Sequence, residues 1–112
     1  MKIKTLNNVI LNTDEQPIPN SSGKSLALRD VIANSILAPM EGDDEKKKFD
    51  RWEIYKKLRS AGGEVSLTAE EISIIKKAIG KLQPPLILGQ CFDLLEGAEA
   101  EMTIERSDHK KK

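Results

Sequence analysis

Residues 68–82 read TAEEISIIKKAIGKL and carry the clearest helix signal of the 112-residue chain. The segment opens with a capping box, in which the Thr68 hydroxyl accepts a backbone amide and the Glu71 carboxylate reaches back to the amide of Thr68. The apolar residues that follow recur at helical spacing and fill one arc of the helical wheel: Ile72, Ile74, Ile75, Ala78, Ile79 and Leu82. The sequence therefore predicts an amphipathic helix, and the rest of the chain must supply the core on which it packs.

Three further helices are predicted around this one. Residues 26–37 place apolar side chains at helical spacing before Pro39, which stops the helix. A second helix is predicted at residues 43–61, which carry acidic residues at their start and basic residues near their end. The Gly62-Gly63 pair ends this helix. Residues 86–95 form a final, mostly apolar helix. The expected core comprises Val31, Ile32, Ile36, Trp52, Tyr55, Leu58, Ile72, Ile75, Ile79, Leu88, Phe92 and Leu95.

The two ends of the chain lack this helical pattern. Residues 2–6 and 9–11 read as short strands that the Asn7-Asn8 turn can join as a hairpin. Because a two-stranded unit is marginal alone, this arm must pack on the helices, pair with a partner or fray. The C-terminal segment has mixed charge and little periodicity. The predicted organisation is mainly α, with about four helices: a hairpin or extended arm at 1–24, a helical domain at 25–97 and a disordered tail at 98–112.

The composition argues against several classes of function. Lys and Arg number 18 and Asp and Glu also number 18, so no net charge draws the chain to nucleic acid or to an anionic membrane. No apolar run approaches the length of a membrane span, and the N-terminus lacks the apolar segment of a signal peptide. The single cysteine, Cys91, fits a reducing compartment. These features predict a cytoplasmic protein that does not enter a membrane.

Residue types that carry catalysis form no recognisable constellation in the sequence. The only histidine, His109, lies in the predicted tail, and Cys91 lies in an apolar helix, where a thiol is usually an inert small hydrophobe. The sequence shows no metal-ligand cluster, Gly-rich phosphate loop or serine motif. We therefore expect no catalytic residues, no cofactor and no metal, and a protein that is not an enzyme.

The helix predicted at 43–61 carries the candidate binding surface, because it holds three of the four aromatic residues. Two interpretations stay open. In one, it is the central helix of the core, and its basic side chains extend outward to solvent. In the other, part of its wide apolar arc is a recognition surface flanked by arginines, since Trp and Arg are enriched at binding hot spots. The candidate partner-binding residues are Arg51, Trp52, Tyr55 and Arg59.

Five segments together carry a resemblance to a known group of proteins. They are LRDVI at 28–32, RWEIYKKL at 51–58, LTAEEI at 67–72, LILGQ at 86–90 and LLEG at 94–97. Their order across residues 25–97 resembles small accessory proteins of tailed bacteriophages and prophages, which are often encoded among virion-assembly genes. The resemblance implies a phage protein in the host cytoplasm that acts by contact with phage or host proteins.

On this resemblance we expect a role in head or tail assembly, as a tail assembly chaperone or a minor structural subunit, with self-association into a homo-oligomer left open. The alternatives are a small nucleic-acid-binding regulator and a host-takeover factor. The polar face of the helix at 68–82 offers mainly lysines, which suit phosphate contact but not base readout, and this disfavours nucleic acid as the partner.

Overall fold

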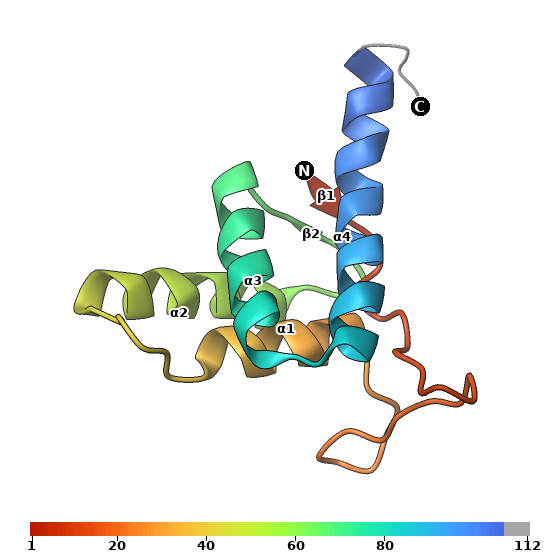
Figure 1. Cartoon of the computed structure of the whole chain (residues 1–112). Coiled ribbons are helices and arrows are strands. Elements are labelled where there is room, and N and C mark those ends of the chain that lie inside the picture. The colour runs from red at the N-terminus through yellow and green to blue at the C-terminus, as the bar shows by residue number, and fades with distance from the viewer. Residues whose placement is uncertain (107–112) are drawn as a thin grey trace.

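The computed structural model describes the backbone of residues 1–106 and the side chains of residues 1–97. Within that range the elements follow in the order β1 (Lys2–Ile3), α1 (Leu28–Leu37), α2 (Glu45–Ser60), β2 (Val65–Ser66), α3 (Ala69–Leu82) and α4 (Pro85–Arg106). Helix α1 packs against both α2 and α3, and α3 packs in turn against α4 (Figure 1). The mainly α fold with four helices and a short β segment at the N-terminus is the one the sequence predicts.

Helix α3 begins at the predicted capping box. The amide of Glu71 donates to the Thr68 hydroxyl at 3.0 Å, and the amide of Thr68 donates to the Glu71 carboxylate at 2.9 Å. The same carboxylate accepts a hydrogen bond from Lys57 of α2 at 2.7 Å, so the cap also joins α2 to α3. The buried face of α3 consists of Ile72, Ile75, Ala78 and Ile79.

A single hydrophobic core joins the helices to the N-terminal arm. Most of the predicted core residues are buried, namely Val31, Ile32, Ile36, Leu58, Ile72, Ile75, Ile79 and Leu95. Tyr55, Leu88 and Phe92 are half-buried against this cluster, whereas Trp52 is exposed and its predicted place in the core is wrong. The arm adds three fully buried side chains that the sequence interpretation left out: Ile3, Leu6 and Ile10. Of the three fates expected for the arm, the structure therefore shows packing on the helices.

The first strand pairs with a different segment from the expected one. Strand β1 runs antiparallel to β2, with Ile3 opposite Val65, and the Met1 amine donates to the carbonyl of Leu67, 66 residues away, at 2.8 Å. Residues 9–11 turn away instead, and Val9 forms an isolated bridge with Ala27. A local hairpin is marginal by itself. Pairing with β2 ties the arm to the start of α3 and buries Ile3 in the core.

A side chain of α4 also bonds to the arm, beside the backbone hydrogen bonds that join residues 6–10 to residues 26–29. The Gln90 amide group donates to the carbonyl of Leu11 at 2.8 Å, and its oxygen accepts the amide of Leu11 at 2.9 Å. Gln90 therefore bonds to Leu11 as a neighbouring strand would, and it holds the arm against the helices.

Helix α4 extends further than the sequence interpretation allowed. It continues through Gly97 to Arg106, although we expected the helix to end near residue 95 and a tail to begin at residue 98. Gly97 costs a helix only about 1 kcal/mol relative to alanine. The residues that follow it include Ala98, Glu99 and Ala100, which favour helix without any apolar periodicity. Residues 107–112 of the expected tail lie outside the described residues.

Truncating a core side chain of α3 should destabilise the fold. Ile75 is fully buried, so Ile75→Ala should lower the free energy of unfolding by roughly 2–5 kcal/mol in chemical denaturation. Its neighbour Ile74 is half-buried, and Ile74→Ala is the matched control, with a smaller expected loss. Equal losses for the two variants would contradict the assignment of the buried face.

Candidate functional site: the outer face of α2

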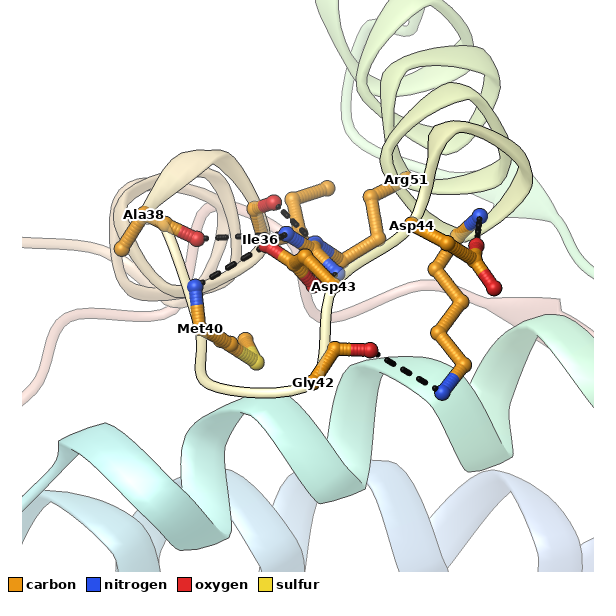
Figure 2. A network of polar contacts seen from close by, with 8 residues as sticks. Ile36, Ala38, Met40, Gly42, Asp43, Asp44 and Arg51 are labelled. Carbon is orange, nitrogen blue, oxygen red and sulfur yellow. Dashed lines mark hydrogen bonds and ion pairs between the residues drawn. The ribbon is translucent and has the colours of Figure 1, made fainter.

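Arg51 lies buried between α2 and the C-terminal end of α1 and does not flank an exposed surface. Its side chain is 9% exposed. The guanidinium donates to the carbonyl of Ile36 at 2.7 Å and to that of Ala38 at 3.3 Å (Figure 2). Two further donors bind the two oxygens of Asp43 at 2.8 and 2.9 Å. Arg51 therefore caps the end of α1 and does not take the surface position that the binding interpretation gave it.

Asp43 completes this cluster from the connector between α1 and α2. Its carboxylate also accepts a hydrogen bond from the amide of Met40, at 2.9 Å. This bond is one of the dashed lines in Figure 2. The hydrogen bonds from Arg51, and then from the Met40 amide, hold the pKa of Asp43 well below its usual range. Gly42 takes a positive φ of 85°, which lets the connector turn sharply just before α2.

The first turn of α2 is capped next to this turn. The Asp44 side chain accepts the amide of Lys47 at 2.8 Å, and the ammonium of Lys47 donates to the carbonyl of Gly42 at 3.3 Å. The side chains of Asp43, Asp44 and Arg51 thus fix the connector, the start of α2 and the end of α1 as one unit (Figure 2).

Arg29 makes the converse contact at the other end of the helix pair. From the first turn of α1 it donates to the carbonyl of Leu58 at 3.0 Å, to that of Ala61 at 3.2 Å and to that of Gly62. Each helix therefore supplies an arginine that caps the C-terminal carbonyls of the other. Arg29 is not among the candidate residues that the sequence predicts. The available signal was its position, because a cation in the first turn of a helix opposes the helix dipole and so needs another reason to be there.

The face of α2 that points away from the core carries one continuous row of exposed side chains. Ile54 and Leu58 are buried on the core side. On the opposite side the exposed residues follow at intervals of four, three, four and three, and we call them the outer face of α2: Glu45, Phe49, Trp52, Lys56 and Arg59. Phe49 is 58% exposed and Trp52 is 40% exposed. These are the two largest apolar side chains of the helix.

Three of the four candidate residues meet at the C-terminal half of this face. The rings of Trp52 and Tyr55 lie 5.5 Å apart between centroids, tilted by 33°. The guanidinium carbon of Arg59 lies 5.8 Å from the centroid of Tyr55, so the cation stacks on the ring as their spacing of four residues allows. Trp52, Tyr55 and Arg59 are therefore brought together, and Arg51 is separated from them by its burial.

Outside the outer face of α2, the titratable groups of the described residues do not form a site for catalysis or for a metal ion. Cys91 is fully buried, and burial raises the pKa of its thiol to about 11, so the thiolate is scarce at neutral pH. A hollow of about 300 Å³ lies below the connector, but Asp43 in its wall is already paired with Arg51. Between residues 1 and 97 no three His, Cys, Asp or Glu side chains form a group that could hold a metal ion. The helices described up to Arg106 include none long and apolar enough to cross a membrane.

Removing the Arg51 side chain should weaken folding. Arg51→Ala leaves the carbonyls of Ile36 and Ala38 without their donor, so we expect the free energy of unfolding to fall by about 2–4 kcal/mol in urea denaturation. Arg59→Ala is the matched control, because Arg59 is exposed, and should change stability by no more than about 0.5 kcal/mol. Similar values for both variants would show that Arg51 is not a structural cap.

Stability should also depend on pH through Asp43. The pKa of Asp43 is lowered in the folded protein, so its contribution is fully present above its unfolded pKa of about 3.9 and is lost as pH falls below that value. Comparing thermal unfolding of the wild type and Asp43→Asn between neutral and acidic pH should show the smaller acid-induced decrease in the variant. Parallel pH profiles would contradict this linkage.

The chain stands apart in the comparisons with known proteins. No protein-family model, no curated protein and no solved structure matches it.

Proposed function

We propose that the protein is not an enzyme and acts through protein–protein contacts made by the outer face of α2. The observation that carries this proposal is the exposure of Phe49 and Trp52 on the side of α2 opposite its buried residues. The chain has only four aromatic residues and builds its core almost entirely from Ile, Leu and Val. Large aromatic side chains that the fold leaves in water favour a contact surface, because their burial against a partner is stabilising.

The side chains around these aromatics also suit a protein partner. Trp, Tyr and Arg are the residue types most enriched at binding hot spots, and Trp52, Tyr55 and Arg59 lie together here. The Trp52 ring lies against the Tyr55 ring, and the Arg59 guanidinium stacks on the Tyr55 ring. These three side chains are therefore partly ordered before a partner binds. A surface that is already ordered loses less conformational entropy on binding.

The proposed biological setting is virion assembly in a phage or prophage, as a tail assembly chaperone or a minor structural subunit in the host cytoplasm. This part rests on the resemblance of the segments between residues 25 and 97 to accessory proteins of tailed phages. A small helical chain with an exposed aromatic face fits such a role, in which the protein must recognise a head or tail protein without altering it chemically.

Three lysines of α2 are paired with carboxylates, and this pairing disfavours the nucleic-acid alternative. Lys46 lies 2.9 Å from Asp50, and Lys57 lies 2.7 Å from Glu71. Lys56 lies 2.8 Å from Glu53 on the outer face itself. Phosphate binding gains affinity from cations that release counterions, and a lysine already beside a carboxylate contributes little to that gain.

The proposal can be tested by affinity capture from cells that produce the phage. A tagged chain should capture a head or tail protein. The Phe49→Ala/Trp52→Ala double variant should bind this partner more weakly by about 2 kcal/mol, which is a rise in Kd of roughly thirtyfold. Leu86→Ala is the matched control, because Leu86 is an exposed apolar residue outside α2.

Circular dichroism melting of each variant separates lost binding from lost folding. Both sites are exposed, so the melting curves should stay close to that of the wild type. The proposal would be overturned by equal capture with the aromatic variant and the wild type. It would also be overturned if the only captured material were nucleic acid that a nuclease removes.

A further inference from the structure

The outer face of α2 has the residue spacing of a coiled-coil seam, with apolar side chains at two of its five positions, Phe49 and Trp52. Its residues are spaced four, three, four and three apart, which is the alternation that keeps one row of side chains facing a partner helix. The row runs over 15 residues, from Glu45 to Arg59, or about 21 Å of helix, and covers nearly the whole of α2. Its two ends carry opposite charges, with Glu45 in the first turn and Arg59 in the last.

We propose that the outer face of α2 binds the same face of a second copy of this chain, with the two helices antiparallel and a two-fold axis at Trp52. This inference rests on the proposed function in one respect, namely that the outer face is a protein-contact surface. In this register Trp52 meets the partner's Trp52, and Phe49 lies opposite the partner's Lys56. Glu45 lies opposite the partner's Arg59.

The charges on the row select this orientation. The antiparallel arrangement sets Glu45 against the partner's Arg59 twice, once on each side of the axis, as an isologous two-fold contact requires. A parallel arrangement sets Glu45 against the partner's Glu45 and Arg59 against the partner's Arg59. Like charges would then face each other at both ends, so only the antiparallel pairing is electrostatically complementary.

The middle of the row supplies contacts of matching chemistry. The two indole rings at the axis give an aromatic contact, and the Lys56 stem and ammonium can lie over the partner's Phe49 ring. Figure 1 shows α2 at one edge of the molecule, reaching away from α4. The outer face therefore lies on a helix that a second copy can approach without displacing the rest of the fold.

The size of the contact sets its strength. Stable protein–protein interfaces bury about 800 Å² on each partner, which is more than one face of a 16-residue helix offers. Self-pairing through α2 is therefore a weak and concentration-dependent association, with an expected Kd in the range of about 1 µM to 1 mM. Sedimentation across a dilution series covers that range.

Two charge reversals, combined in one experiment, test the register. Glu45→Arg gives a chain with two positive ends on the row, and Arg59→Glu gives a chain with two negative ends. Each variant alone should dimerise at least about tenfold more weakly than the wild type, because both attractive pairs become repulsive. An equimolar mixture should form a heterodimer in which both opposite-charge pairs are restored. Glu70→Arg and Lys81→Glu on α3, also exposed but off the row, are the matched controls and should leave dimerisation unchanged.

Weakening in each variant without recovery in the mixture overturns the proposal. Weakening in each variant with recovery in the mixture supports antiparallel pairing at Trp52. A wild-type chain that stays monomeric up to about 1 mM overturns it, and so does a dimer that is indifferent to both reversals. Capture of a head or tail protein through Phe49 and Trp52 by a monomeric chain would overturn the self-pairing and leave the proposed function standing. A dimer that responds to the reversals but captures no virion protein would leave the self-pairing standing and overturn the assembly role.

Discussion

The exchange of arginines between α1 and α2 is the interaction on which the geometry of the protein depends. A helix ends with four carbonyl groups that lack a partner inside the helix, and α1 has no basic residue in its own last turn and is followed at once by Pro39. Arg51 supplies donors from α2 to two of these carbonyls, those of Ile36 and Ala38, and Arg29 does the same for the end of α2 from the start of α1. Because each arginine binds the last carbonyls of the other helix, the two contacts together hold α1 and α2 against each other and fix the rotation of α2 about its own axis.

That rotation explains why the chain buries a guanidinium and exposes an indole. Consecutive residues of a helix point about 100° apart, so Arg51 and its neighbour Trp52 cannot both face α1. On hydrophobicity alone the tryptophan would be the one to turn inward. Arg51 instead finds two carbonyls and the carboxylate of Asp43 on the inner side, and this set satisfies most of its donors at once. The exposure of the outer face of α2 is thus a consequence of satisfying the hydrogen bonds of α1.

These relations also show what the sequence could reveal and what it could not. The start of α3 was predictable because the capping box involves Thr68 and Glu71, three residues apart, and the stacking of Arg59 on Tyr55 follows from a spacing of four. The burial of Arg51 was not predictable in this way, since its partners lie in α1 and in the connector. The pairing of β1 with β2 is likewise set by a partner far along the chain. Hydrophobicity alone predicts a place in the core for Trp52, because it takes no account of the hydrogen bonds that a neighbouring helix needs.

Arg51 lies on the inner side of the same helix whose outer face carries Trp52. A loss of binding through the outer face can therefore arise in two ways. Arg51 and Trp52 share one turn of α2, and the first holds the helix that presents the second. A substitution at Arg51 that reduces binding therefore acts through the orientation of α2, and it must reduce stability as well. A substitution at Trp52 removes contact area but leaves every hydrogen bond of Arg51 in place, so binding falls while stability holds. Binding and stability measured together therefore distinguish the role of Arg51 from that of Trp52. Binding alone would not, because substitution of either residue reduces it.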